Sequence, residues 1–149
     1  MNSHAPPAAG VAAAGRLLKI LYFVLLGTVG LYWVVLEFVA AGLEPREPGL
    51  VKNILQGMGA AVGAGVVYLR FFLIPAALDA ATMEPAQRLA RLRLYYILCF
   101  VLTEAVAIYG FLLRLLGGAP QDAALFFLAA AGLFLLCYPR LPDNGGTPA

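Results

Sequence analysis

Residues 94–113 read LYYILCFVLTEAVAIYGFLL, a run of twenty residues that contains one acidic side chain, Glu104, and lies between Arg93 and Arg114. A helix rises ~1.5 Å per residue, so this run extends ~30 Å, about the thickness of the hydrocarbon core of a bilayer. We therefore predict a transmembrane helix whose Glu104 carboxyl lies ~15 Å from either water phase. An ionisable group at that depth is costly and usually has a function.

The composition agrees with a chain dissolved in lipid. Hydrophobic residues make up 62% of the sequence and charged residues 12%, and the mean hydropathy is +0.87. These values predict a membrane-embedded domain rather than a soluble one. The net charge of +2 is too small to indicate nucleic-acid binding, and we expect no nucleic-acid partner.

Apolar runs and the prolines and glycines between them divide the chain. We predict an all-α integral membrane protein whose membrane domain, residues 16–140, has four transmembrane helices, at about 17–42, 50–78, 88–117 and 122–138. The flanking segments, 1–15 and 141–149, are polar or rich in small residues and proline, and we expect both to be flexible tails.

The basic residues predict the orientation. With four spans, the two tails and the middle loop share one side, and that side carries seven basic residues against three on the other. The seven are Arg16, Lys19, Arg70, Arg88, Arg91, Arg93 and Arg140, and the three are Arg46, Lys52 and Arg114. Because cytoplasmic loops are enriched in Lys and Arg, we expect both termini in the cytoplasm, in a bacterial inner membrane.

The residues of catalysis and metal binding are scarce. His4 is the only histidine and lies in the N-terminal tail, while Cys99 and Cys137 fall within separate apolar runs. We interpret the two cysteines as small hydrophobic side chains, and we expect no metal site and no cofactor. The sequence contains no nucleophile with a neighbouring base and no phosphate-binding loop, so we predict that the chain is not an enzyme by itself.

Small residues crowd the second predicted helix between Gln56 and Gly65. At four-residue spacing they form two neighbouring stripes, which comprise Gly59 and Gly63 in one and Gly57, Ala61 and Gly65 in the other. Small residues let membrane helices approach closely and gain dispersion contacts. Two arrangements fit the pattern, a single tight helix pair within one chain or a helix packed on several neighbours in a ring.

The third predicted helix pairs its carboxylate with Ile108-Tyr109-Gly110 one turn later. This pattern, together with the glycine-rich helix before it, resembles the proteolipid family, the c subunits of rotary ATPase rotor rings, over residues 52–113. The resemblance implies a hairpin of the second and third helices, a ring of identical subunits, and a proton that binds at Glu104. Folding the hairpin about Thr82 places Ala60 and Ala61 opposite the carboxyl, and Tyr109 is the candidate hydrogen-bond partner. Sodium-binding relatives usually have a hydroxyl residue directly after the carboxylate, whereas this chain has Ala105. The resemblance therefore favours a proton over a sodium ion.

Other interpretations of these residues remain open. Glu104 could contact a partner or lipid, or form a purely structural hydrogen bond to a carbonyl or to Thr103. Glu37, near the end of the first helix, is either an interfacial carboxylate or a relay beside Glu104. Several tyrosines near helix ends are interpreted as interfacial anchors, namely Tyr22, Tyr68, Tyr95, Tyr96 and Tyr138.

The expected partners are membrane lipids, further copies of the chain and possible other membrane subunits. The alternative function is that of a structural or accessory subunit of a larger complex, a scaffold or a lipid or quinone contact, without ion transport.

Overall fold

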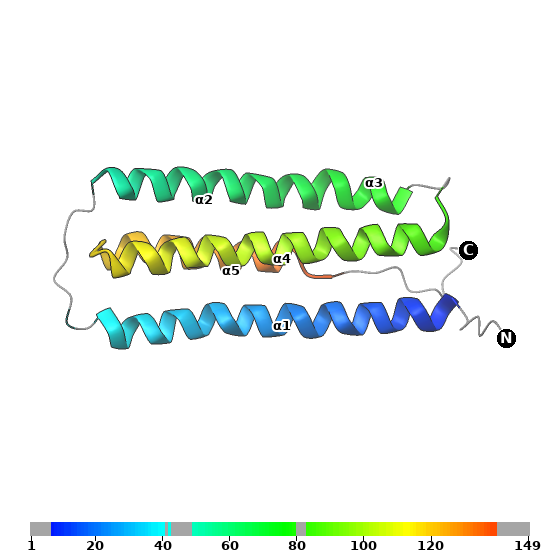
Figure 1. Ribbon diagram of the computed structural model, residues 1–149, viewed down its shortest axis with the longest axis horizontal. Helices are drawn as coiled ribbons and strands as arrows, with labels where there is room; N and C mark the ends of the chain where they lie inside the picture. The colour runs from blue at the N-terminus through cyan, green and yellow to red at the C-terminus, as the bar shows by residue number, and fades with distance from the viewer. Residues whose placement is uncertain (1–6, 41, 43–48, 80–82, 140–149) are drawn as a thin grey trace.

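The structure of the protein, a computed structural model, describes residues 7–40, 42, 49–79 and 83–139, with side chains from Ala12 onward. The tail 141–149 and most of the first loop lie outside the described residues. The elements are α1 (Pro7–Ala40), α2 (Leu50–Tyr68), the π-helical turn η1 (Leu69–Leu73), α3 (Ile74–Asp79), α4 (Pro85–Leu115) and α5 (Pro120–Leu136). All of these elements are helical, which confirms the all-α prediction (Figure 1).

Three of the helical segments are long and apolar enough to cross a membrane: Ala12–Ala40, Leu50–Asp79 and Pro85–Leu115. The fourth, α5, is apolar but shorter. Large apolar side chains on the outer surface, such as Phe38, Leu128 and Leu135, are at least 70% exposed. A soluble protein rarely exposes so much contiguous apolar surface, so these helices suggest a membrane location.

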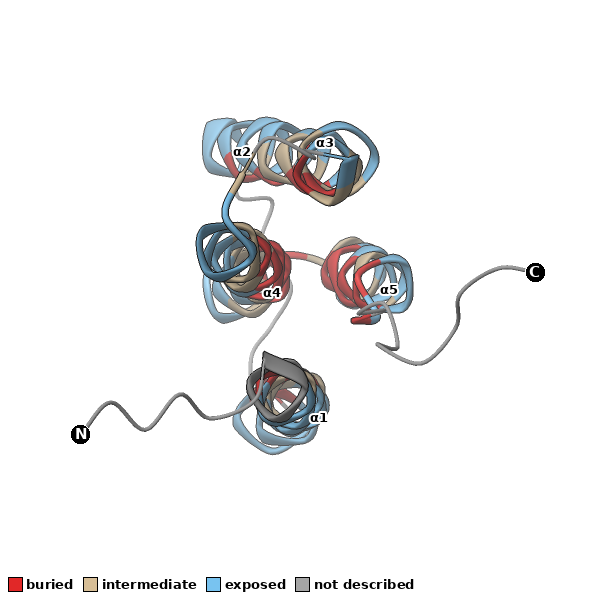
Figure 2. Ribbon diagram, turned by 90° about the vertical axis from the view of Figure 1, so that its right-hand side faces the viewer, coloured by how far each residue is buried: buried red, intermediate tan, exposed pale blue. Residues whose placement is uncertain are grey.

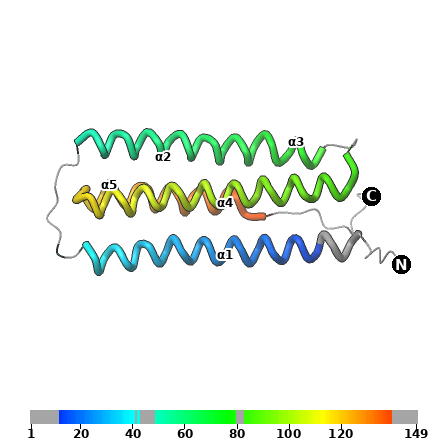
Figure 3. Tube along the Cα trace, in the orientation of Figure 1, coloured from blue at the N-terminus to red at the C-terminus, as the bar shows by residue number. Residues whose placement is uncertain are grey.

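The helices alternate in direction along the chain, and α4 packs against all three of the others. Seen end-on, α4 and α5 lie side by side in the middle, with α2 and α3 on one flank and α1 on the other (Figure 2). Consecutive helices α1 and α2 are therefore not neighbours in the bundle. The parallel helices α1 and α4 are in direct contact instead, as the tube of Figure 3 also shows.

Two helix starts differ from the predicted boundaries. α1 begins at Pro7, earlier than the expected start near residue 17, and so includes part of the segment that we expected to be a flexible tail. Alanine is the best helix former, and this segment is rich in alanine. α4 begins at Pro85, where a proline without an N–H loses nothing at the first helical position.

The helical segment Leu50–Asp79 is irregular one turn before Pro75. The backbone N–H of Ile74 bonds to the carbonyl of Leu69, five residues earlier, which closes the π-helical turn η1. Proline has no N–H to give to the carbonyl of Phe71 and its ring crowds that carbonyl, so the preceding turn widens. The helix Leu50–Asp79 continues through this turn as one span.

The tight turn between α4 and α5 depends on glycine. Gly117 has a φ of 88°, and Gly118 donates its N–H to the carbonyl of Leu113 at 2.9 Å. A Cβ on Gly118 would lie 2.7 Å from that same carbonyl oxygen, so only glycine fits. This turn ends α4 at Leu115, close to the predicted end of the third helix at about residue 117.

Aromatic side chains form the core near the α5 C-terminus. Tyr22 makes edge contacts with Phe100 and Phe134, each with ring centroids 5.8 Å apart. Tyr22 and Tyr96 are 3% and 1% exposed, so they belong to the core and are not the interfacial anchors that we expected. The prediction used only their positions near the ends of the predicted helices. Position along a helix does not say whether a ring points between helices or outward.

A candidate site at Glu104 between α1 and α4

Glu104 of α4 faces α1 rather than α2. Its side chain is half-buried, and Oε1 accepts a hydrogen bond of 3.1 Å from the Tyr32 hydroxyl of α1. Among the described residues it has no ion-pair partner. A neutral donor, the Tyr32 hydroxyl, therefore holds the carboxyl at mid-height of an apolar bundle. A buried carboxyl needs such a hydrogen-bond partner.

Tyr32 is the contact of Glu104 that sequence reasoning missed. It was not among the candidate partners, yet its ring centroid lies 5.8 Å from that of Phe111 and its hydroxyl reaches Glu104. The pairing arises because the parallel helices α1 and α4 touch, and nothing in the local sequence reports which helices become neighbours. The one signal in the sequence was the hydroxyl that Tyr32 places in the middle of the first apolar run, because a polar group there needs a partner.

The predicted partners of Glu104 on α2 lie elsewhere. Ala60 and Ala61 are exposed, and Ala60 lines a groove between α2 and α5. Tyr109 is half-buried against the core and forms no hydrogen bond with Glu104 among the described residues. The structure thus brings Glu104 together with Tyr32, and not with the three residues that the sequence proposed.

The difference from the predicted register has a physical cause. Gly59 of α2 and Gly110 of α4 both face Phe126, so they lie near the same level of the bundle. Because α2 and α4 are antiparallel, the residue of α2 level with Glu104 is then close to Gly65 rather than Ala60. α4 starts beyond the end of α3, so a hairpin folded symmetrically about Thr82 misplaces the register (Figure 1).

The two glycine stripes of α2 meet different surroundings. A Cβ on Gly59 would lie 2.6 Å from the Phe126 ring, and one on Gly63 would lie 3.8 Å from Leu133, so this stripe packs on α5. A Cβ on Gly57 or Gly65 would meet no atom within 4 Å. The second stripe is therefore not used inside the chain.

Thr103 and the two cysteines form a separate buried cluster between α4 and α5. Cys99 and Cys137 are both free thiols with 0% exposure, and their side chains lie close together. Thr103 is also fully buried, its hydroxyl has no hydrogen-bond partner among the described residues, and it lies near the Cys137 thiol. Thr103 thus does not hold Glu104.

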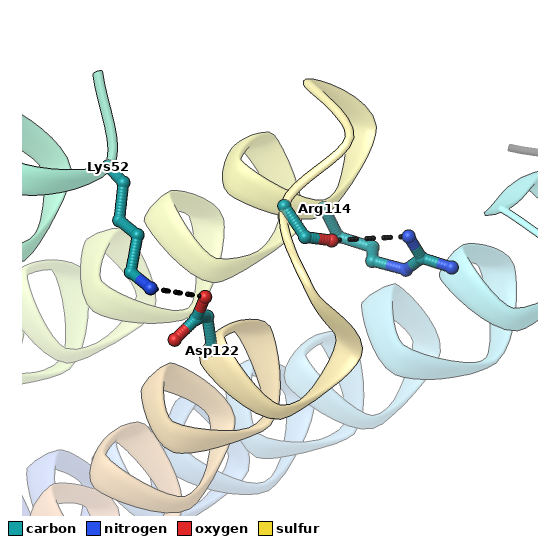
Figure 4. A network of polar contacts seen from close by, with 4 residues as sticks. Lys52, Arg114 and Asp122 are labelled. Carbon is teal, nitrogen blue, oxygen red and sulfur yellow. Dashed lines mark hydrogen bonds and ion pairs between the residues drawn. The ribbon is translucent and has the colours of Figure 1, made fainter. Parts of the chain in front are cut away.

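Polar side chains tie the helices together at the end of the bundle where α1 and α4 finish. Arg114 donates to the carbonyl of Gly118 at 3.2 Å (Figure 4). It also donates to the carbonyl of Ala40 at 3.3 Å, which joins α4 to α1. Lys52 of α2 pairs with Asp122 of α5 at 2.7 Å. Glu37 is exposed here and lines a cavity of about 120 Å³ with Arg114.

The positions of Glu37 and Arg70 refine their interpretations. Glu37 lies five residues beyond Tyr32 on α1, ~7.5 Å further along the helix axis, and the structure records no contact between Glu37 and Glu104. Arg70 donates its Nε–H to the carbonyl of Leu136 at 2.7 Å and so binds the free C-terminal end of α5. No group of three or more His, Cys, Asp or Glu side chains that could hold a metal occurs among the described residues.

Comparisons of the chain with models of protein families, with curated proteins and with solved structures found no match. The function is therefore inferred from the geometry around Glu104 and from the surfaces that the bundle leaves open.

Proposed function

We propose that this chain is a membrane proteolipid whose Glu104 carboxyl binds and releases protons, as the resemblance of residues 52–113 to rotor-ring c subunits implies. The observation that carries the proposal is the pair of Glu104 and Tyr32, a carboxyl at mid-height of apolar helices with a single neutral donor. An ionisable side chain at this depth in a membrane typically belongs to an ion or proton pathway.

The pair suits reversible protonation. Tyr32 donates to Oε1, which leaves Oε2 to carry the proton in the neutral form. In the charged form the same phenol stabilises the carboxylate, although a single neutral hydrogen bond does not replace the water that a free carboxylate would have. Release then requires an external group, such as a cation supplied by another subunit, next to Glu104.

Self-association is the second part of the proposal. The open stripe of Gly57, Ala61 and Gly65 offers a second copy the close approach that membrane helices need. A head-to-tail contact that repeats between identical subunits gives a ring when the rotation closes, and we propose a closed ring here. The packed stripe of Gly59 and Gly63 is already occupied by α5 and cannot serve that contact.

The orientation with both termini in the cytoplasm of a bacterial cell, inserted in the inner membrane, also remains part of the proposal. Its support is the excess of basic residues at the end of the bundle where α1 begins and α3 meets α4. Cysteine-accessibility labelling at positions 46 and 88 tests it, because the two positions should label from opposite sides. Labelling from the same side would refute the orientation.

Labelling with a hydrophobic carbodiimide, which modifies protonated membrane carboxyls, tests the role of Glu104. The full-length protein in lipid vesicles should take up one label, and Glu104→Gln should abolish it while Glu37→Gln does not. Tyr32→Phe should keep the label, because it removes the hydroxyl donor and leaves the Glu104 carboxyl in place. Mass spectrometry of the intact chain reads all three variants.

The competing function is that of a structural or accessory membrane subunit without ion transport. Its support is that the Glu104 hydrogen bond closes within one chain and joins α1 to α4. This function predicts no labelling from pH 6 to pH 9 and a Glu104→Gln variant that assembles and functions normally, since an amide can still accept from Tyr32. That combined result would refute the proton-binding proposal.

A further inference from the structure

An open groove lies between α2 and α5, on a different side of α4 from Glu104. It has a volume of about 610 Å³ and a predominantly apolar lining. The two polar lining residues, Gln56 and Asp122, both lie near the starts of their helices, so the groove is polar at one end only. Pockets of this size with few polar groups are typical of small-molecule sites in proteins.

Small side chains create the groove. α2 and α5 run parallel and touch over only a short stretch, where the Phe126 ring fits against Gly59. Beyond that contact three of the lining positions carry little bulk, namely Ala60, Ala129 and Gly132. A Cβ at Gly132 would meet no atom within 4 Å, so the space beside it is not filled by the chain itself.

The dimensions of the groove select the shape of its occupant. From Asp122 to Leu136 the helix rises ~21 Å, which for a volume of about 610 Å³ leaves a mean cross-section of ~30 Å². An α-helix with side chains is ~10 Å or more wide and needs ~80 Å². The groove is thus long, shallow and open on its outer side, a shape that suits one extended hydrocarbon chain lying along it better than a fully seated helix of a second copy.

The polar end places the headgroup. Lys52 and Asp122 form their ion pair of 2.7 Å in the first turns of α2 and α5, where a membrane helix meets the headgroup layer (Figure 4). An ammonium group binds phosphate oxygens as a point charge, and the amide of Gln56 adds a donor at the groove end. The groove then runs from the headgroup layer past the middle of a hydrocarbon core ~30 Å thick.

We propose that the α2–α5 groove binds one acyl chain of a phospholipid, with the phosphate of the headgroup at Lys52. The site is independent of the proton-binding role of Glu104, since the two lie on different faces of α4 and share no residue. Its bound lipid differs from the surrounding lipid in having one chain held between two helices.

Photo-crosslinking of the full-length protein tests this site. The probe is a phosphatidylethanolamine with an alkyl diazirine near the end of one chain, diluted into phosphatidylethanolamine–phosphatidylglycerol vesicles. We expect adducts to concentrate in residues 59–67 and 129–136, as mapped by peptide mass spectrometry. Adducts spread evenly over the exposed faces of α1 and α4 would mean surrounding lipid only and would overturn the proposal.

Two glycines supply a matched pair of variants. Gly132→Leu places a side chain in the groove, and Gly30→Leu places the same side chain on the exposed face of α1, where a Cβ also meets no atom. Gly132→Leu should lower the groove adducts about tenfold, equivalent to ~1.4 kcal/mol, while Gly30→Leu leaves them unchanged. Equal adducts in both variants, or chemical crosslinks that place a second copy in the groove, would refute the acyl-chain site.

The headgroup assignment has its own control. Lys52→Gln should lower adduct formation by the phospholipid probe but not by a diacylglycerol probe with the same diazirine chain, because only the first carries a phosphate. An equal response to both probes would refute the phosphate contact. Gly132→Leu should leave carbodiimide labelling of Glu104 intact, so failure of this site is distinguishable from failure of the proposed function.

Discussion

The two faces of α2 carry small residues at the same spacing but meet different neighbours. Gly59 is buried against the Phe126 ring, whereas Gly57, two residues earlier, faces open space. The first glycine is needed for the fold of one chain, and the second is available to a partner. Glycine spacing alone therefore indicates that a close approach is possible without saying which helix makes it.

The largest effect is expected at the packed face. In Gly59→Leu the new side chain has to displace the Phe126 ring, which is itself held by its contact with Gly110. We expect the free energy of unfolding to fall by about 3 kcal/mol, at the upper end of overpacking effects in well-packed cores. Equilibrium unfolding in mixed micelles measures it, and a variant as stable as the wild type would contradict the packed assignment.

A double-mutant cycle sharpens the same contact. Phe126→Ala should destabilise the wild-type chain but relieve the clash in Gly59→Leu, because the ring that obstructs the leucine is gone. We expect a coupling free energy of about 2 kcal/mol between the two positions. Additive effects would show that the leucine is accommodated some other way.

The ion pair at the start of α2 should matter less than the glycine contact. Lys52 and Asp122 are 2.7 Å apart, but their side chains are 33% and 19% exposed. For a pair that is open to water we expect Lys52→Ala to lower the free energy of unfolding by about 0.5 kcal/mol. The same unfolding assay checks this, and a loss as large as that of Gly59→Leu would mean that charge, not packing, fixes α2 on α5.

The open face should show the smallest effect on the fold and a distinct effect on assembly. Gly57→Leu should leave the unfolding of a single chain unchanged, since a Cβ there meets nothing. In mild detergent it should shift the protein from oligomer to monomer, which size-exclusion chromatography with light scattering measures. A wild-type protein that is monomeric, or a Gly57→Leu variant that still assembles, would exclude this stripe as the self-association surface.

Element type and approximate length were predictable because they depend on local composition. An uninterrupted apolar run of bilayer length forms a helix, and proline and glycine mark its ends, as at Pro85 and Gly117. The start of α1 at Pro7 was missed because alanine was read as part of a flexible tail. Alanine forms helix well, and that preference decided the structure.

The candidate site was only half predictable. Glu104 was identifiable from the sequence because an ionisable side chain within an apolar run is costly and usually functional. Tyr32 was not, because its role depends on the contact of parallel helices α1 and α4, which are separated in the chain by the whole of α2 and α3. The pairing of Glu104 with Ala60 and Ala61 assumed adjacent helices in a symmetric hairpin, and the observed stagger changes which residues are level.

The sequence by itself determined that this chain is helical, apolar and built around one acidic residue at mid-span, because hydropathy and helix length are local properties. Only the tertiary structure decided which of two glycine stripes is packed, which hydroxyl reaches Glu104, and that a groove remains between α2 and α5. Apolar helices in lipid have no strong preference for one neighbour over another. The order of helices around α4 follows from how small and large side chains fit together, and that fit is visible only when all the helices are in place.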